Sequence, residues 1–457
     1  MAGSALSEKK EMAGVDKEKM SGMVKIVFVS LLLDLLAFTM ILPLLPSLLD
    51  YYGNTDQVKS GLYTSMLSSC TAFRELLGIP DTEKYNSVLF GGIIGSLFSF
   101  LQFIICPVCG AASDYYGRRP LMIISMIGIV ASYILWALSH NFTIFVLARI
   151  VGGLSKSNVS LSTTIVTDVS STKTRGKGMA LVGIAFSIGF IVGPLIGAFF
   201  ASRGVGEGTA FYVKPALLAL TLATADLLFI IAFMKETLPE GKRANSFSNS
   251  LTDVQDLINP ISLFNFAAVK EVRRKSMLRQ VGLSYFFYLF IFSGLEFTLT
   301  FLVHRRFNYT SMQQGRMFFF MGSIMAIVQG GYVRRIQPGK EKKVALMGII
   351  VLIPAFIIIG YATTPFVCYL GLTLFSFASA TVVPCLTTLV STFGKDDQKG
   401  TVLGIFRSLG ALARAFGPII ASSVYWSLGA TTCYIFGGVS LLLPVVILQR
   451  AVSVKSD

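Results

Sequence analysis

The stretch Gly176–Gly197, GKGMALVGIAFSIGFIVGPLIG, decides the fold, because the chain carries a version of it twice. A shift of 224 residues places Gly193-Pro194 on a second Gly-Pro pair, Gly417-Pro418. Both copies are long apolar segments that follow a short basic loop. A repeat between two segments of membrane length is typical of transporters built from two related halves. The sequence therefore predicts a duplicated membrane protein.

The two copies differ at two positions inside the apolar segment. Where the first copy has Gly183 and Phe190, the second has Arg407 and Arg414. Charged side chains inside a membrane span are costly, and those that occur are usually functional. We interpret the first copy as a hinge and packing surface, and the second as part of a binding site.

The composition excludes a soluble protein. Of 457 residues, 53% are apolar and only 14% are charged, with a mean hydropathy of +0.69. The net charge of +15 does not indicate a nucleic-acid partner, because the basic residues lie in short loops between apolar runs. Cys106 and Cys109 form a CxxC pair, but with no second pair and only two histidines no metal site is expected. No removable signal peptide is expected either.

Apolar stretches of about 18–25 residues, long enough to cross a bilayer core, recur along the chain. They predict an all-α integral membrane protein with twelve transmembrane helices in two pseudo-symmetric six-helix halves. The expected spans are 24–48, 88–109, 121–139, 142–166, 177–200, 213–234, 280–303, 313–333, 344–362, 365–392, 400–425 and 430–449.

The linker between the halves is expected to carry an amphipathic helix. Leu257, Ile261, Phe264 and Ala268 recur near helical spacing, which favours a helix on the membrane surface. A plain flexible linker is the alternative. The expected parts are a cytoplasmic tail 1–23, an N-terminal half 24–234, the cytoplasmic linker 235–279, a C-terminal half 280–449 and a cytoplasmic tail 450–457.

Lysine and arginine predict the orientation. The short loops that share a side with the termini are basic, whereas the loop 50–87 on the other side holds more acids than bases. By the positive-inside rule both termini are cytoplasmic, in the plasma membrane or an intracellular membrane. One exception is His304-Arg305-Arg306, which falls on the opposite side.

The loop after the second span reads GAASDYYGRRP and resembles the signature G-x-x-x-D-x-x-G-R-[RK] of the major facilitator superfamily. We interpret it as a gate latch, in which Asp114 ends one helix where an arginine can pair with it. Arg118 can reach acids or helix C-termini in the other half. A generic cytoplasmic loop, the alternative, needs the two arginines but not the acid and the glycines. The gating residues are Gly110, Asp114, Gly117, Arg118 and Arg119.

Two further motifs resemble those of the same superfamily. Span four carries Arg149 in an R-x-x-x-G motif, followed by Lys156 near the middle of the span. Span five matches the G-x-x-x-G-P-x-x-G motif of drug:proton antiporters, which allows close helix contact and helix bending. Its residues are Gly189, Gly193, Pro194 and Gly197.

The buried charges point to an anionic substrate. Three acids lie in spans (Asp34, Asp226 and Glu296) against four cations, and an anion would offset the surplus positive charge. A carboxyl in a cavity can also load and release protons. The alternative is that these charges form fixed ion pairs. The substrate-binding candidates are Arg407, Arg414, Lys156, Arg149 and Glu296, and the proton-coupling candidates are Asp34, Glu296 and Asp226.

Four longer stretches resemble the tetracycline-transporter-like organic-anion transporters of animals, and the chain is similar more distantly to bacterial tetracycline:proton antiporters. The resemblance implies alternating access and amphiphilic anions as substrates. Those antiporters carry an acid in the ninth span, but 344–362 has none, which argues against tetracycline itself. The matching stretches are Leu31–Asp50, Tyr85–Phe103, Gly294–Phe320 and Gln398–Pro418.

The expected function is secondary active transport of small amphiphilic organic anions, with protons as a possible coupling ion. No enzyme chemistry, cofactor or nucleic-acid partner is expected, and the protein should act as a monomer in the bilayer. Two alternatives stay open: an uncoupled facilitator, and a membrane scaffold or sorting protein that has kept the fold without flux. A scaffold has no need of four cations in the membrane interior.

Overall fold

The computed structural model describes residues 22–56, 61–77, 86–170, 175–202, 210–240, 243, 259–266, 275–337, 339–393 and 399–451. Within these ranges the chain is helical and contains no strand. A first helix covers 22–39. The elements that follow are η1 (Leu42–Leu44), α2 (Leu45–Asp56), α3 (Leu62–Leu77), α4 (Asn86–Tyr116), α5 (Arg118–Ala137), α6 (Phe142–Ser155), α7 (Asn158–Val169), α8 (Arg175–Ser202), α9 (Val213–Phe233), α11 (Pro260–Asn265), α12 (Lys275–Phe307), α13 (Ser311–Gly331), η4 (Val333–Arg335), α14 (Glu341–Tyr361), α15 (Pro365–Ser391), α16 (Lys399–Ser440) and α17 (Leu442–Arg450).

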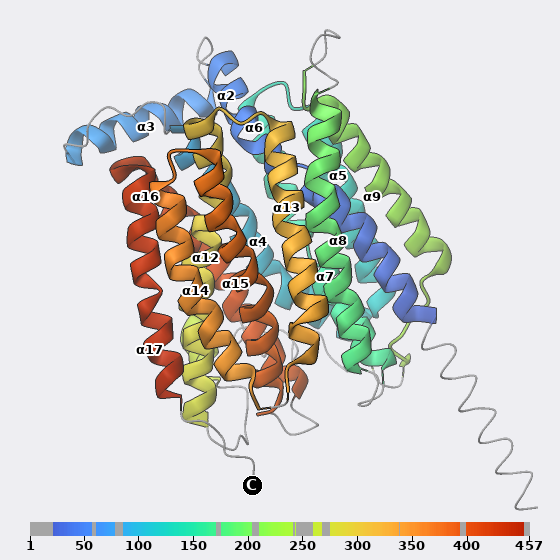
Figure 1. The fold of residues 1–457 in the computed structure, drawn as a ribbon. Helices are drawn as coiled ribbons and strands as arrows, with labels where there is room; N and C mark the ends of the chain where they lie inside the picture. Colours follow the sequence, from blue (N-terminus) through green and yellow to red (C-terminus); the bar gives the residue numbers. More distant parts are fainter. Residues whose placement is uncertain are drawn as a thin grey trace, which may run out of the picture.

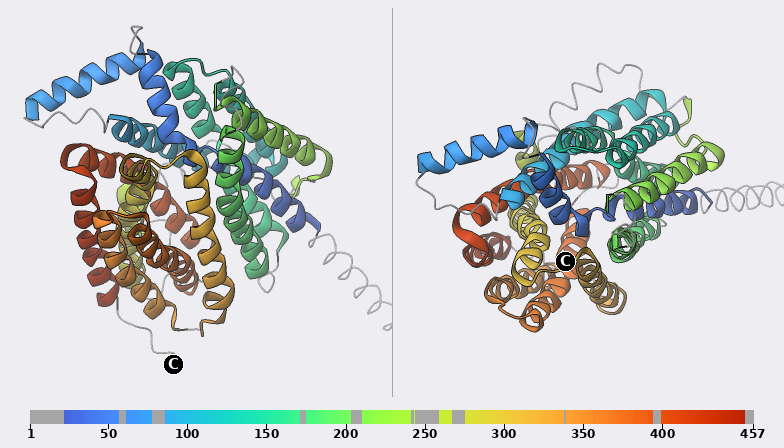
Figure 2. Two further views of the ribbon diagram at one scale, coloured as in Figure 1. Left: turned by 45° about the horizontal axis from the view of Figure 1, so that its top comes forward. Right: turned by 90° about the horizontal axis from the view of Figure 1, so that it is seen from above.

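The helices form two groups that lie side by side. Figure 1 shows α5, α7, α8 and α9 on one side and α12, α14, α15, α16 and α17 on the other. The groups meet mainly along two helix pairs, α4 with α16 and α8 with α13, and Figure 2 shows the bundle from two further directions. Exchanging the halves of the repeat turns one of these pairs into the other, as a duplicated fold requires.

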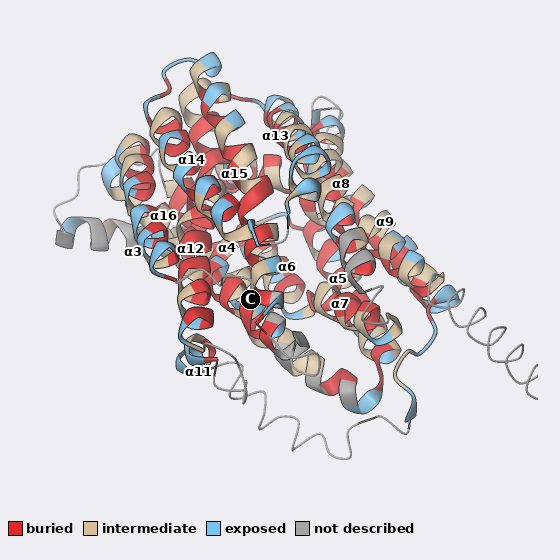
Figure 3. Ribbon diagram, turned by 60° about the horizontal axis from the view of Figure 1, so that its bottom comes forward, coloured by how far each residue is buried: buried red, intermediate tan, exposed pale blue. Residues whose placement is uncertain are grey.

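We name the two ends of the bundle by the parts of the chain that lie there. The terminal end is where the first helix begins and α17 finishes, and the distal end carries α2, α3 and the start of α13 (Figure 1). Figure 3 marks the buried positions that run along the helices between these ends. This core is mainly apolar, with large buried side chains such as Phe90, Phe301 and Phe375, but it also encloses polar and charged groups.

Within the part of the chain that the structure describes, ten helical segments are long and apolar enough to cross a membrane, so the protein is a multi-pass membrane protein. The predicted eighth span corresponds to α13, a helix of 21 residues that is not among the ten. The predicted eleventh and twelfth spans fall in one continuous stretch, Gly404–Arg450, which is interrupted at Gly429 by a non-helical φ of 82°. All twelve predicted spans are thus helical, whereas twelve crossings remain a prediction.

Two connections differ from their expected form. The region 50–87, expected as a loop, carries the end of α2 and the whole of α3, which projects sideways from the distal end in Figure 1. In the linker the described helix is α11, only six residues long. It ends at Phe266, whose positive φ of 48° stops the helix and whose ring is buried beside α12. Leu257 and Ala268 lie outside the described residues.

Candidate functional site

Lys156 is held by Asp34 in a buried ion pair inside the N-terminal half. Its Nζ lies 2.6 Å from Oδ1 and 2.7 Å from Oδ2 of the carboxylate. The two side chains are 5% and 0% exposed, so the pair is shielded from water. Both residues were predicted to be functional, and the structure brings them together from the first helix and the predicted fourth span.

A break in the fourth span places this lysine. α6 ends at Ser155 and α7 begins at Asn158, so Lys156 lies between two short helices. The backbone carbonyl groups freed by the break still find donors. The carbonyl of Ser155 accepts from the hydroxyl of Ser125 at 2.5 Å, and that of Lys156 accepts from the amide of Gln102 at 3.2 Å. Non-helical backbone at membrane depth requires hydrogen-bond partners of this kind for its polar groups.

Asp226 of α9 is the third charged member of this cluster. It is fully buried and lies within electrostatic range of Asp34 and Lys156. Neither of its carboxyl oxygens has a hydrogen bond among the described residues. Ser30 lies close by, but without hydrogen-bond geometry. The N-terminal half therefore buries two acids with one lysine.

Arg149 lies beside an aromatic pair rather than an acid. Its guanidinium carbon is 4.3 Å from the ring centre of Phe98, and the ammonium of Lys156 is 4.7 Å from that of Phe38. The two rings are 5.6 Å apart. Within the described part of the chain Arg149 has no ion pair. A small pocket next to it is lined by Phe38, Ile41, Ser132, Tyr133, Trp136, Ala148 and Arg149.

Arg407 and Arg414 lie on one face of α16 in the C-terminal half. Both side chains are exposed, although they belong to an apolar helix. Tyr285 of α12 lies within electrostatic range of both arginines, and its ring stacks on Phe406 with centroids 3.8 Å apart. Glu296, also on α12, lies within range of Arg414 but forms no ion pair with it. Neither arginine has an acid partner in the described ranges.

The predicted site residues thus form two clusters, one in each half. Asp34, Lys156 and Asp226 form the first, with Arg149 near it across the Phe38 and Phe98 rings. The second contains the arginines of α16 with Glu296. No hydrogen bond or ion pair between described residues joins the two clusters.

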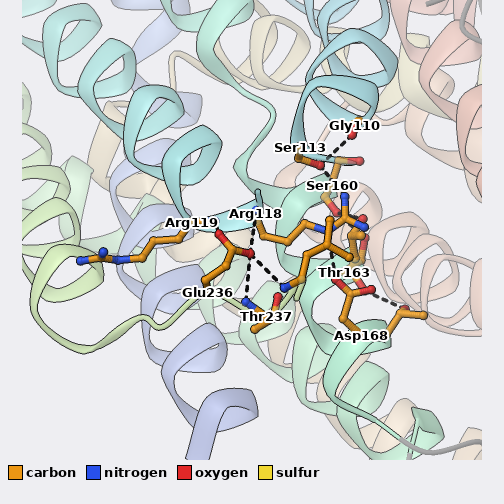
Figure 4. A network of polar contacts seen from close by, with 12 residues as sticks. Gly110, Ser113, Arg118, Arg119, Ser160, Thr163, Asp168, Glu236 and Thr237 are labelled. Carbon is orange, nitrogen blue, oxygen red and sulfur yellow. Dashed lines mark hydrogen bonds and ion pairs between the residues drawn. The ribbon is translucent and has the colours of Figure 1, made fainter. Parts of the chain in front are cut away.

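The predicted gate latch forms its contacts inside the N-terminal half. Figure 4 shows Arg118 pointing toward Asp168 at the end of α7, with Nε 2.9 Å from Oδ2. Arg118 also donates to the hydroxyl of Ser113 at 2.6 Å. Both of these contacts lie within the N-terminal half, and the expected reach of Arg118 into the other half stays a prediction. The side chain of Asp114 lies outside the described residues.

Glu236 is a member of this latch that the sequence analysis missed. Its carboxylate accepts the backbone N–H groups of Arg118 at 2.9 Å and Arg119 at 3.1 Å, and so caps the N-terminus of α5 (Figure 4). Burial raises the pKa of Glu236, but backbone donors, including Thr237 and Leu238, outweigh burial and leave the pKa lowered. Gly117 permits this approach, since its φ is 106° and a Cβ there would lie 2.5 Å from the carboxylate. The available signal was an acid just after the sixth span.

The glycines of the span-five motif pack α8 against the first helix. A Cβ at Gly189 would lie 2.6 Å from that of Leu35, and one at Gly193 would meet the hydroxyl of Thr39 and lie 2.9 Å from the Leu36 carbonyl oxygen. Gly197 contacts Met40 in the same way. The predicted packing surface is therefore present, and α8 continues through Pro194 as a single helix.

The comparisons with known proteins agree with this architecture. Residues 27–418 match the sequence profile of the Major Facilitator Superfamily. The chain is 48% identical over 431 residues to the mouse major facilitator superfamily domain-containing protein 10, covering 93% of this chain and 92% of that protein. It is 25% identical over 408 residues to the class B tetracycline resistance protein of Escherichia coli, covering 89% of each.

Solved structures show the same relationship. The crystal structure of the human organic anion transporter MFSD10 (TETRAN) superposes with a TM-score of 0.78 at 48% identity, covering 94% of this chain and 99% of that one. A D-xylose-proton symporter shares the fold, with a TM-score of 0.68 at 15% identity, covering 94% of this chain and 97% of that one. With these relatives and two related helical halves, the chain belongs to the major facilitator superfamily, a family of transporters and not of enzymes.

Proposed function

We propose that the protein transports small amphiphilic organic anions by alternating access, and that proton transfer is coupled to this movement. The human relative at 48% identity is an organic anion transporter, which supports the substrate class. The expected position of the site is between the two clusters, since each half supplies cations to the interior of the bundle.

The observation that carries the proposal is the set of arginines without acid partners. Lys156 is neutralised by Asp34, but Arg407 and Arg414 have no ion pair among the described residues. An exposed guanidinium within an apolar helix must face lipid or water, and lipid is the costlier choice. Exposure of both arginines therefore supports a water-filled cavity that attracts anions.

Asp226 is our choice for the residue that carries the proton. Its oxygens have no hydrogen bond in the described structure, so it can bind a proton without losing a partner. Lys156 lies within electrostatic range and can respond to its charge. When Asp226 is ionised, two carboxylates compete for the lysine, and when it is protonated only Asp34 does. The proton thereby changes the charge balance of the N-terminal half.

The test is uptake of a panel of organic anions into proteoliposomes, with and without an imposed proton gradient. Wild-type protein should take up aromatic carboxylates, and the gradient should increase net uptake. Asp226→Asn should keep exchange of internal for external substrate but lose the response to the gradient. Asp253→Asn in the linker is the control and should respond like the wild type.

Two results would contradict parts of the proposal. If uptake by the wild-type protein does not change with the proton gradient, the protein is an uncoupled facilitator. Absence of uptake for every anion, from protein that is folded and correctly inserted, would favour a scaffold role instead.

A further inference from the structure

The basic residues at the end of α12 have partners at the distal end, where basic residues were not expected. Arg306 is fixed within the C-terminal half. It donates to the carbonyl groups of Gly360 at 2.8 Å and Ala362 at 3.1 Å, at the C-terminus of α14, and to the hydroxyl of Thr431 at 3.1 Å. A cation at a helix C-terminus is a stabilising contact, so Arg306 has a structural role.

The two residues before it reach across to the other half. His304 Nε2 lies 3.0 Å from Oδ2 of Asp50 on α2, and Arg305 contacts Oδ1 of the same carboxylate. Arg305 also donates to the hydroxyl of Ser87, in the first turn of α4, at 2.8 Å. These contacts join α12 to two helices of the N-terminal half. We name Asp50, Ser87, His304 and Arg305 the distal latch.

The hydrogen-bond pattern of His304 fits a doubly protonated ring. Its Nδ1 lies 3.1 Å from the carbonyl oxygen of Tyr309, while Nε2 faces the carboxylate of Asp50. Both partners are acceptors, but a neutral imidazole has only one N–H. In the neutral ring one bare nitrogen lone pair would point at an oxygen. Arg305 donates to Oδ1, so an ionised Asp50 satisfies both of its cationic neighbours.

We propose that His304 is a proton-binding site which closes the distal end of the transporter when it is protonated. The distal latch holds the two halves together only while α12 stays next to α2. Opening the distal end removes the Asp50 carboxylate from Nε2, so the contact between the protonated ring and this carboxylate exists only in the closed state. Acid on the distal side therefore favours closure, because protonation of the ring stabilises the state that contains this contact.

Few charged groups of the described residues face the ring. Asp50 approaches from α2, and Arg305 lies on the same helix as the histidine and shares that carboxylate. Arg306 is turned toward α14. The groups from Ser87 of α4 and from the Tyr309 backbone are neutral. Among the described residues, Asp50 is therefore the one acid that faces both Arg305 and the protonated ring. The proton on His304 stabilises the closed state only while Asp50 lies next to the ring.

This proton site is distinct from the coupling proposed for Asp226. It lies at the distal end of α12 and acts on access, whereas Asp226 lies within α9 in the N-terminal cluster. Its test needs no substrate. A conformational measurement can therefore fail without bearing on anion transport, and transport can fail without bearing on the latch.

The experiment measures the distance between the distal ends of the two halves as a function of pH. Spin labels are placed at Asn54, at the end of α2, and at Phe366, at the start of α15, both of which are exposed. Pulsed electron paramagnetic resonance on the full chain in lipid nanodiscs then gives the populations of short and long distances. The variant is His304→Gln. The control is His140→Gln, because His140 is exposed and is the only other histidine in the chain.

In wild-type protein the ratio of closed to open populations should fall about tenfold between pH values of about 5.5 and 8, where histidine ordinarily titrates. His304→Gln should give a ratio that does not vary with pH, and His140→Gln should behave like the wild type. Asp50→Asn should lower the closed population at every pH and remove most of the titration. The proposal is overturned if the wild-type ratio is flat, or if His304→Gln titrates as the wild type does.

Discussion

At the scale of single residues, the sequence identified the charged groups but not their pairing. Lys156 was expected to bind substrate, with a fixed ion pair as the alternative, and it forms an ion pair with Asp34, 122 residues earlier in the chain. Arg118 pairs with Asp168 of its own half, and its expected reach into the other half stays a prediction. Hydropathy shows that a charge lies in a span, but not which side chain it faces. The Asp34–Lys156 pair therefore became visible only in three dimensions.

This buried pair predicts a non-additive effect on stability. Asp34→Asn or Lys156→Met alone should each cost about 3–5 kcal/mol, because each leaves one buried charge without its partner. The double variant Asp34→Asn/Lys156→Met should recover most of that loss. Thermal unfolding of the purified protein in detergent measures this, with Lys25→Met as the control, since Lys25 is an exposed lysine of the same helix as Asp34. Additive losses in the double variant would show that the pair is not coupled.

At the scale of helices, the long apolar spans were predictable and the shorter or interrupted elements were not. The helix α3 has 16 residues and mixes polar with apolar side chains, so it carries no membrane-length signal. The break between α6 and α7 is also invisible in hydropathy. Its free carbonyl groups accept hydrogen bonds from side chains of neighbouring helices, and hydropathy does not report such contacts. The glycine motif of α8 was predictable, since close helix contact needs small residues at fixed spacing.

Two glycines of α8 give a matched test of that packing. Gly193→Ala should destabilise the protein by about 1–3 kcal/mol, because the new Cβ would lie 2.9 Å from the backbone oxygen of Leu36 and would displace the hydroxyl of Thr39. Gly183→Ala should be neutral or slightly stabilising, since nothing lies within 4 Å of its Cβ and alanine favours helix. The thermal unfolding temperatures of both variants, compared with that of the wild type, measure this difference in stability. Equal stabilities would mean that α8 does not rely on this contact.

At the scale of the whole molecule, the internal repeat predicted two related halves, and the paired contacts α4–α16 and α8–α13 agree with it. At the terminal end each half also has a basic residue that contacts a carbonyl group near a helix end, although the two residues are not equivalent under the 224-residue shift. Arg119 donates to the carbonyl of Ile231 near the end of α9, and Lys342 donates to that of Gln449 near the end of α17. What the repeat could not predict is which end of the bundle is joined. The distal latch depends on His304 and Arg305, and Asp50 lies in the other half.

The central claim is that the arginines of α16 bind the anion, and the most direct test is initial uptake of an aromatic carboxylate by variants in proteoliposomes. Arg407→Ala and Arg414→Ala should each reduce uptake by about tenfold or more, because each removes a cation that forms no ion pair in the described structure. Arg450→Ala, an exposed arginine at the end of α17, should transport normally. Normal uptake by both α16 variants, at wild-type levels of inserted protein, would contradict the account.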